Sequence, residues 1–302
     1  MKAVLSRKKG PPEILRFADI EKPMPGSTEV LIKVRYGTVT RGDVNMRTFP
    51  RLVLTVLGAL FGFKPMEIPG IEFSGDVEEV GVGVTAFRPG DAVCGTATGL
   101  RRGAAAEYVC VPERSKMGVL VHKPAAVPYR EAAAVLVGSM TAMQLLKPDG
   151  IERGENVLVY GASGSVGSYA VQQAKLAGAN VTAVCGPSNL HIVRSIGADR
   201  VIDYTHEKVT DTDERYDHIF DAVGKISKRA YRAILAKGGR FSSVRSPTKE
   251  RVEEAQRALD LVAEGKLVVV IDREYELAGI VEAHRYVEAG HKKGNVVVHV
   301  AG

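Results

Sequence analysis

The sequence predicts an α/β protein in which a doubly wound parallel sheet is joined to a β-rich module. A glycine-rich turn at residues 161–167 lies between a short apolar run and a helical pattern. From residue 157 to residue 244, apolar runs alternate with helical stretches, which is typical of parallel strands linked by crossover helices. Residues 1–125 instead show two-residue hydrophobic alternation and frequent turn signals, as expected of a compact β-rich fold.

The glycine-rich turn predicts a binding site for the diphosphate of a dinucleotide. Glycines at 161, 164 and 167 let backbone N–H groups approach a phosphate where a Cβ would block the way. The turn follows a predicted strand, opens a predicted helix and is followed by a second strand at 180–185, so the βαβ context of such sites is present. A tight turn without a ligand is the alternative interpretation.

The composition indicates a cytoplasmic protein of two domains. Its 302 residues are 45% hydrophobic and 25% charged, and no apolar stretch reaches the length of a membrane span. Charged side chains occur among the first residues, too early for the hydrophobic region of a signal peptide to form. The net charge of +6 is scattered, so we expect no nucleic-acid partner, and the three cysteines, which are far apart, are expected to be free thiols.

Residues 52–63 break the pattern of the β-rich module, because they are apolar almost throughout. They predict a short helix that is buried or lid-like and that cannot span a bilayer. Three roles stay open for this helix: a wall or lid over the substrate site, core packing, and a contact between subunits.

The second half of the chain predicts helices and strands in alternation. A helix is expected at 131–146, and another begins at Ser246, has Ala255 and Leu259 on its apolar face and ends at Gly265. The expected parallel strands are 157–160, 181–185, 200–204, 218–222 and 240–244. Two later strands, at 268–271 and 296–300, are expected to pack back onto the first module.

Several motifs in order resemble those of the medium-chain dehydrogenase/reductase superfamily, and within it the zinc-free quinone oxidoreductase-like (zeta-crystallin-like) branch. The motifs lie at residues 69–75, 80–93, 103–108, 141–142, 161–167 and 197–204. The resemblance implies a GroES-like catalytic domain formed by residues 1–125 and 266–302. A Rossmann dinucleotide-binding domain, residues 126–265, would be inserted between these two segments.

The resemblance also implies that the chain has no metal site. Zinc alcohol dehydrogenases of the superfamily have a Cys ligand where this chain has Thr40 and a His ligand where it has Ile71. Their structural-zinc cysteines would fall between residues 93 and 103, where this chain has only Cys94. Because a catalytic zinc needs three protein ligands, no credible zinc site is left, and Glu72 beside the lost ligand is expected to have a structural role.

The acceptor pocket of the resembled branch corresponds to residues 39–47. Asp43 and Arg47 match the usual motif, whereas Thr40 replaces an Asn and Asn45 replaces a Tyr. Hydrogen-bonding capacity is kept at both changed positions, so Thr40, Asn45 and Arg47 are the expected catalytic-site residues. For Asp43 and Arg47, an ion pair within the domain is an equally open alternative.

The end of the second strand of the dinucleotide domain favours NADPH. Folds that prefer NAD place an acid there for the ribose 2′-OH, but residues 185–189 contain none. Ser188 and Asn189 can donate hydrogen bonds to a 2′-phosphate, the resemblance adds Tyr204, and Arg194 adds charge if it turns inward. The residues assigned to the cofactor are Thr141, Gly161, Ser163, Gly164, Ser165, Val166, Gly167, Ser188, Asn189, Tyr204, Val223 and Asn295.

The expected activity is therefore a metal-independent transfer of hydride from NADPH to a small-molecule acceptor, either a quinone or another conjugated carbonyl. Two alternatives stay open: an enal or enone double-bond reductase, and a non-catalytic NADPH-binding protein. Relatives usually form a sixth strand that joins subunits, but here only Arg245 separates residues 240–244 from the predicted helix start. We expect a five-stranded sheet whose edge Arg240 and Arg245 protect, and a monomer or a dimer formed through another surface.

Overall fold

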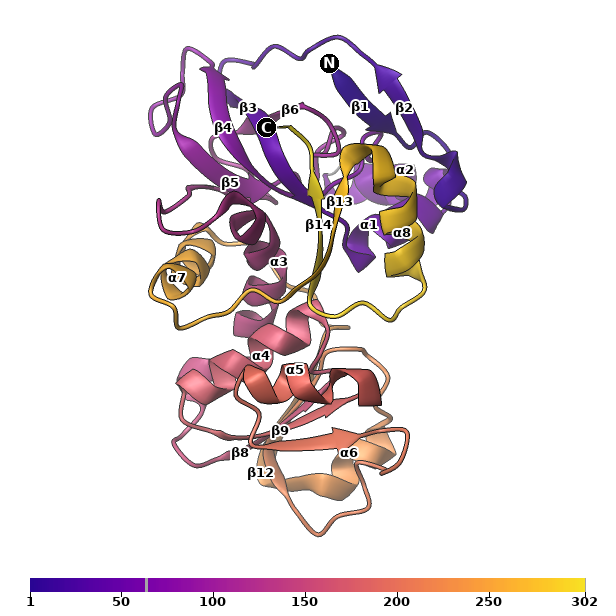
Figure 1. Cartoon of the computed structure of the whole chain (residues 1–302), viewed down its shortest axis with the longest axis vertical. Coiled ribbons are helices and arrows are strands. Elements are labelled where there is room, and N and C mark those ends of the chain that lie inside the picture. Colours follow the sequence, from indigo (N-terminus) through magenta and orange to yellow (C-terminus); the bar gives the residue numbers. More distant parts are fainter. Residues whose placement is uncertain (63–64, 302) are drawn as a thin grey trace. The chain divides into compact units, whose positions relative to one another are not determined.

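The computed structural model describes residues 1–62 and 65–301, which fall into two units (Figure 1). Unit 1 comprises Met1–Leu136, Glu250–Ala263 and Ile271–Gly302, and unit 2 comprises Val137–Lys249 and Glu264–Val270. Unit 2 is therefore an insertion into unit 1. Residues 126–136 and 250–263, expected in the dinucleotide-binding domain, group with unit 1, and residues 266–270, expected in the GroES-like domain, group with unit 2.

Unit 2 is built on a parallel sheet, which has five strands in the order β10-β9-β8-β11-β12 within the described residues. Each of the expected parallel strands is present, so this part of the prediction is confirmed. The strands are β8 (Asn156–Tyr160), β9 (Asn180–Cys185), β10 (Arg200–Asp203), β11 (Tyr216–Asp221) and β12 (Leu235–Ser243). Helices cover both faces: α4 (Ser165–Leu176) and α5 (Leu190–Ser195) lie on one face and α6 (Lys228–Ile234) on the other (Figure 1).

Unit 1 contains a mostly antiparallel sheet in the order β13-β14-β3-β4-β5-β7, with β6 also paired to β3. Its strands are β3 (Glu29–Thr38), β4 (Glu72–Val80), β5 (Ala92–Thr96), β6 (Tyr108–Pro112), β7 (Leu120–His122), β13 (Ile271–Glu276) and β14 (Asn295–His299). A separate hairpin joins β1 (Lys2–Leu5) to β2 (Arg16–Asp19). The helices are α1 (Arg41–Thr48), α2 (Arg51–Phe61), α7 (Val252–Ala263) and α8 (Ile280–Glu288), and α3 (Tyr129–Leu146) begins in unit 1 and continues into unit 2.

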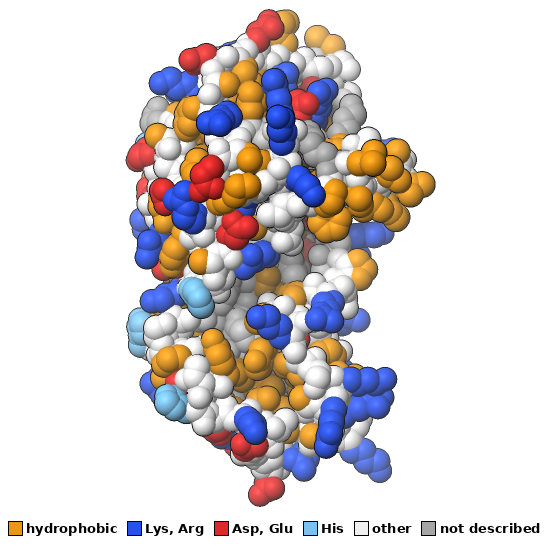
Figure 2. Space-filling view, turned by 90° about the vertical axis from the view of Figure 1, so that its right-hand side faces the viewer, with side chains coloured by type: hydrophobic (Ala, Val, Ile, Leu, Met, Phe, Trp, Pro, Cys, Tyr) orange, Lys and Arg blue, Asp and Glu red, His pale blue; other side chains and the backbone are white. Residues whose placement is uncertain are grey.

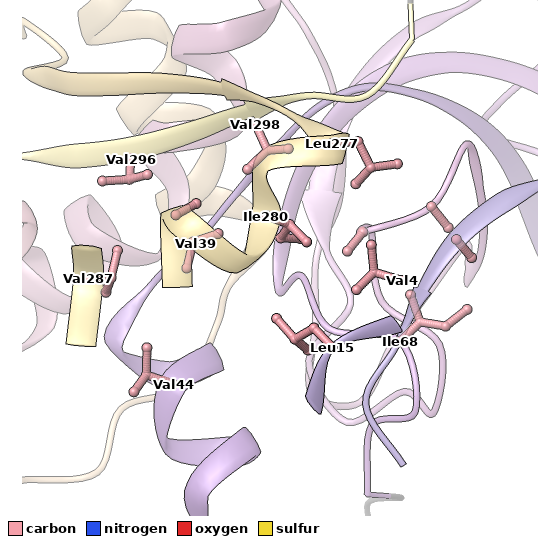
Figure 3. Close-up of a cluster of buried hydrophobic side chains, with 14 residues drawn as sticks. Val4, Leu15, Val39, Val44, Ile68, Leu277, Ile280, Val287, Val296 and Val298 are labelled. Carbon is pink, nitrogen blue, oxygen red and sulfur yellow. The ribbon is translucent and has the colours of Figure 1, made fainter. Parts of the chain in front are cut away.

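One core of unit 1 is assembled from both ends of the chain (Figure 3). Val4 comes from β1, Val39 follows β3, and Ile280 and Val298 come from the last part of the sequence. Each of these side chains is at most 3% exposed. Burying an aliphatic side chain of this size stabilises a fold by roughly 1.5–3 kcal/mol, so unit 1 depends on its C-terminal segment.

Two elements differ from the predicted ones because side-chain amides bind their backbone. The strand expected at 268–271 begins only at Ile271, as β13, since Gln172 Oε1 accepts the Val268 N–H at 2.7 Å and Gln172 Nε2 donates to the Val268 carbonyl at 3.0 Å. The helix expected from Ser246 begins only at Val252. Before it, the Lys249 N–H donates to Gln144 Oε1 at 2.9 Å, which holds this segment in a non-helical path.

The expected edge protection by Arg240 is also wrong. Its Nη2 donates to the carbonyls of Leu146 and Lys147, at 3.2 and 3.1 Å, where α3 ends. Arg240 therefore binds two carbonyl groups at the end of α3, of which that of Lys147 also accepts the Gly150 N–H at 3.0 Å.

The apolar segment at 52–63 forms helix α2 as far as Phe61, which confirms the helix but not its burial. Leu54 is only 7% exposed, but Leu52 is 78% and Leu60 73% exposed. Phe63, which belongs to the same run, lies outside the described residues.

Candidate functional site

The glycine-rich turn folds tightly at the end of β8. Gly161 has a φ of +77°, a conformation that favours glycine, and its N–H donates to the Val184 carbonyl at 2.9 Å. A Cβ at Gly161 would lie 2.2 Å from Val223 Cγ2, and one at Gly167 would lie 2.2 Å from the Gly161 carbonyl oxygen. Both positions therefore require glycine for reasons of packing.

Gly164 is the N-cap of α4 and faces open space. A Cβ there would meet only the Gly161 carbonyl oxygen, at 3.5 Å. The first turn of a helix presents N–H groups that have no intrahelical acceptor, together with the positive end of the helix dipole. Ser165, Val166 and Gly167 form this first turn, so the predicted diphosphate site has the geometry that an anion requires.

A polar cluster joins the turn to the end of β9. Asn189 Nδ2 donates to Ser163 Oγ at 3.0 Å, and Ser188 Oγ donates to Asn189 Oδ1 at 3.1 Å. Tyr204 lies at the same place, because a Cβ on Gly186 would be 3.4 Å from the Tyr204 hydroxyl oxygen. The structure therefore brings together four residues that the sequence analysis assigned to one ligand.

Asp203, which the sequence analysis missed, stands beside this cluster. It ends β10, and its Cα is paired with that of Cys185. Its carboxylate accepts hydrogen bonds from the Thr205 N–H and Oγ1, at 2.9 and 2.7 Å. Burial alone would raise the pKa of this carboxyl, but the pKa is lowered because these hydrogen bonds stabilise the charged form. Arg194 also acts electrostatically on Cys185, whose pKa burial raises to about 11. Asp203 lies inside the motif at 197–204, but its place beside Cys185 depends on strand pairing, which the motif does not show.

Val223 lies in a loop that one carboxylate organises. Asp221 accepts hydrogen bonds from the N–H groups of Val223, Gly224 and Ile226, at 3.0, 2.8 and 2.9 Å. A cavity of about 350 Å³ opens beyond the ends of β11 and β12, with Asp221, Lys228 and Arg245 in its wall. Ligands of doubly wound folds bind outside the carboxyl ends of such strands.

Thr141 is half-buried on α3 in unit 2. One turn earlier in this helix, a Cβ on Gly138 would lie 2.5 Å from Ser165 Oγ. The helix therefore packs closely against the start of α4, the turn that is predicted to bind the diphosphate.

The remaining predicted residues belong to unit 1. Thr40 is the N-cap of α1: its Oγ1 accepts the Asp43 N–H at 3.2 Å and donates to Asp43 Oδ2 at 2.6 Å. The other oxygen of Asp43 accepts the Gly70 N–H at 2.9 Å, and burial raises the pKa of this carboxyl. Asp43 is therefore part of a capping box and not of an ion pair.

Arg47 has the structural role that was left open and not the expected contact with substrate. Its side chain is 1% exposed, Nη2 lies 2.7 Å from Glu288 Oε2, and Nη1 donates to the Gly10 carbonyl. Asn45, two residues earlier, is exposed on the same helix.

Thr40 and Asn295, far apart in the sequence, are neighbours in the fold. Val297 pairs with Thr38, and the Val39 N–H donates to the Val296 carbonyl at 3.0 Å. The next position of this antiparallel register brings Asn295 opposite Thr40. Lys292, also missed, precedes this strand. Burial lowers the pKa of Lys292 to about 8, although the carboxylate of Glu72 opposes the shift.

The residues around Thr40 do not fit a zinc ion. Thr40 Oγ1 is engaged with Asp43, and Glu72 accepts a hydrogen bond from Thr38 Oγ1 at 2.8 Å. Among residues 1–62 and 65–301, no three His, Cys, Asp or Glu side chains are grouped as metal ligands. Cys94 is a free, buried thiol.

Comparison with known proteins gives a consistent result. Residues 26–125 match the alcohol dehydrogenase GroES-like domain, and residues 165–274 match a family described as zinc-binding dehydrogenase. The chain is 31% identical to the chloroplast envelope quinone oxidoreductase homolog of Arabidopsis thaliana, over 94% of this chain and 93% of that one. It is 30% identical to a mitochondrial NAD(P)H oxidoreductase of Mus musculus, over 99% and 89% of the two chains. The quinone oxidoreductase structure from Coxiella burnetii matches with a TM-score of 0.85 and 26% identity, over 100% and 99%.

Proposed function

Because the chain belongs to the medium-chain dehydrogenase/reductase superfamily, in its quinone oxidoreductase-like branch, we propose that it is an NADPH-dependent oxidoreductase that reduces a quinone or another conjugated carbonyl without a metal. The observation that carries this proposal is the open N-terminus of α4 beside an acid-free turn after β9.

The residues of unit 2 fit a phosphorylated dinucleotide. The first turn of α4 would hold the diphosphate, and Ser188 and Asn189 would donate to the 2′-phosphate. Arg194 adds a positive charge close to Cys185, and two hydrogen bonds from Thr205 partly compensate the negative charge of Asp203. This balance favours NADPH over NADH, by a smaller factor than a site with a lysine would give.

When bound, the nicotinamide ring supplies the hydride, so the protein needs no nucleophile of its own. Its contribution is to orient the ring and to offer donors to the oxygen on which charge develops. On the acceptor side we retain Thr40 and Asn45 and withdraw Arg47, whose guanidinium is occupied inside unit 1. Thr40 can act only by sharing its hydroxyl between Asp43 and the acceptor.

Steady-state oxidation of NADPH and NADH, with a panel of quinones and of enals and enones, tests the proposal. We expect turnover with quinones, a higher kcat/KM for NADPH, and no loss of activity in a chelator. Equal or higher kcat/KM for NADH would contradict the cofactor assignment, and one tightly held zinc per chain would contradict the metal-independent mechanism. Turnover of enones alone would favour a double-bond reductase. Tight NADPH binding without turnover would indicate a binding protein.

A further inference from the structure

Helix α2 presents an apolar face to solvent. Leu52, Val56 and Leu60 follow one another at four-residue intervals and are 78%, 52% and 73% exposed. Val53 and Phe61 are 42% and 70% exposed. In Figure 2, a dense group of hydrophobic side chains stands out from the surface at the height at which Figure 1 labels α2. Contiguous apolar surface of this kind usually marks an interaction site.

The helix is attached to unit 1 by its opposite face. Leu54 is 7% exposed and Gly58, one turn later, is also buried. Residues 52–62 carry no charge, so every outward side chain except Thr55 is apolar or absent. At 1.5 Å per residue, the 11-residue helix is about 16 Å long and offers this face along its whole length.

Positive charge lies near one end of the apolar face. Residues 44–66 contain no Asp or Glu. Arg7, Lys8 and Lys9 are all exposed, and Gly10, which follows them, is bonded to the end of α1. The Gly10 N–H donates to the Arg47 carbonyl at 3.3 Å, and α2 begins four residues after Arg47. A run of three cations therefore lies near the start of α2, whose residues after Arg51 carry no charge.

We propose that α2 docks the protein on the surface of an anionic lipid bilayer, with the helix in the plane of the interface. Exposed leucine, valine and phenylalanine side chains would enter the boundary between headgroups and acyl chains, and Arg7, Lys8 and Lys9 would face the anionic headgroups. No helix in the described part of the chain has the length and apolar character to cross a membrane, so the attachment is peripheral and reversible.

A second copy of the chain fits this face less well. Half the surface of a helix about 16 Å long and about 11 Å wide is roughly 300 Å², less than half of the ~800 Å² that each partner contributes to a typical stable interface. A two-fold contact with the two helices parallel would also bring the two clusters of Arg7, Lys8 and Lys9 toward each other, which is unfavourable for like charges.

The chain contains no tryptophan, so a single introduced indole reports on this helix alone. Val56→Trp places the probe on the apolar face, and Val82→Trp is the matched control, since Val82 is 99% exposed in a turn away from α2. With vesicles of phosphatidylcholine and phosphatidylglycerol, we expect a blue shift of emission and quenching by brominated lipid for Val56→Trp only. Equal spectra of the two variants with and without vesicles would overturn the proposal.

Binding to the same vesicles is then measured by flotation for two sets of substitutions. Leu52→Ser with Val56→Ser and Leu60→Ser should lower the bound fraction by about tenfold or more, because each change removes apolar transfer. Lys8→Gln with Lys9→Gln should lower binding to anionic vesicles but leave the helix intact.

Wild-type protein that does not float with vesicles would contradict docking. A concentration-dependent dimer that the serine variants abolish would also contradict docking. A higher KM for acceptors in the serine variants, measured without lipid, would assign α2 to a lid and contradict docking as well.

Discussion

Gly164 and Gly167 are three residues apart, but a side chain at one position would clash with the backbone and a side chain at the other would not. A Cβ at Gly167 would overlap the Gly161 carbonyl oxygen at 2.2 Å, and a backbone atom cannot move aside cheaply. A Cβ at Gly164 would have only one neighbour, at 3.5 Å, so the space in front of it is free for a ligand. Gly167 is therefore needed for packing, whereas Gly164 leaves room for the predicted ligand.

We predict that Gly167→Ala and Gly164→Ala separate stability from binding. Gly167→Ala should lower the free energy of unfolding by about 3 kcal/mol, as expected of a forced steric overlap. Gly164→Ala should cost at most about 1 kcal/mol as an N-cap change. It should nevertheless raise the Kd for NADPH about tenfold, because its methyl group blocks the phosphate. Urea unfolding and fluorescence titration measure the two effects, and a Gly164→Ala variant with unchanged affinity would refute the placement of the diphosphate.

A carboxylate placed after β9 should reverse the cofactor preference. We predict that Ser188→Asp lowers the ratio of kcat/KM for NADPH to that for NADH by about tenfold or more, because an acid repels the 2′-phosphate and accepts from a ribose 2′-OH. Ser188→Ala is the control and should change the ratio only slightly. A ratio that is the same in both variants would show that Ser188 does not contact this phosphate.

Some residues of the candidate site could be predicted from local motifs, and others could not. The turn at 161–167 could be read directly, because its glycines, strand and helix are contiguous in the sequence. Asp203 lies in the motif at 197–204, but neither that motif nor the sequence around Lys292 indicated a place in the site, since strand pairing and the path of the chain bring these residues close to the predicted ones. Arg47 matched a motif, yet its guanidinium group is paired with the carboxylate of Glu288, which is 241 residues away.

At the scale of elements, side chains decide where helices and strands begin. Gln172 occupies both hydrogen-bonding groups of Val268, so the strand in this part of the chain begins only at Ile271. The parallel strands of unit 2 were predictable, because short apolar runs separated by helices leave few other arrangements. Contacts such as that of Gln172 with Val268, 96 residues away, leave no trace in a local pattern.

The loop that carries Val223 should depend on a single carboxylate. We predict that Asp221→Asn lowers the free energy of unfolding by about 1–3 kcal/mol, because an amide cannot accept from all three N–H groups. It should also raise the KM for NADPH several-fold as the loop loosens. Asp211→Asn, in an exposed turn, is the control and should leave both quantities unchanged. Unaltered KM in a destabilised Asp221→Asn enzyme would show that the loop does not meet the cofactor.

For the whole molecule, the sheet of unit 2 predicts how subunits can and cannot meet. The outer strand β12 pairs with β11 in the described residues, and its other side carries backbone groups free for pairing. Because exposed Lys237 lies in β12 and exposed Arg245 follows it, and charge on an edge strand opposes edge-to-edge pairing, we predict that hydrogen exchange of the outward N–H groups of β12 does not depend on protein concentration. Protection that increases with concentration would indicate a dimer joined edge to edge through this strand.

A buried histidine should make unit 1 sensitive to acid. His284 is 1% exposed, and within the described part of the chain neither ring nitrogen has a hydrogen-bond partner. Burial and then the nearby charge of Arg47 lower the pKa of His284 to about 3. The unfolded chain takes up a proton below about pH 6.5, so stability is fully present above that value and declines as the pH falls toward 3.

We predict that His284→Leu removes part of this acid sensitivity. Between pH 7 and pH 4.5, the wild-type free energy of unfolding should fall by about 2–3 kcal/mol more than that of the variant. Urea unfolding at the two pH values measures the difference. His122→Leu, which replaces an exposed histidine, is the control and should follow the wild type. Parallel losses in all three proteins would show that His284 is protonated in the native state.

The insertion of unit 2 into unit 1 has a consequence for synthesis on the ribosome. The long segment of unit 2, Val137–Lys249, is complete before the last fifty residues of the chain have been translated. The sheet and core of unit 1 must wait for β13, β14 and α8, which are made last. During that interval the nascent chain carries the long segment of unit 2 with all five described strands of its sheet, together with an N-terminal part of unit 1 whose apolar surface is uncovered. That N-terminal part is the part of the newborn protein in greatest need of a chaperone.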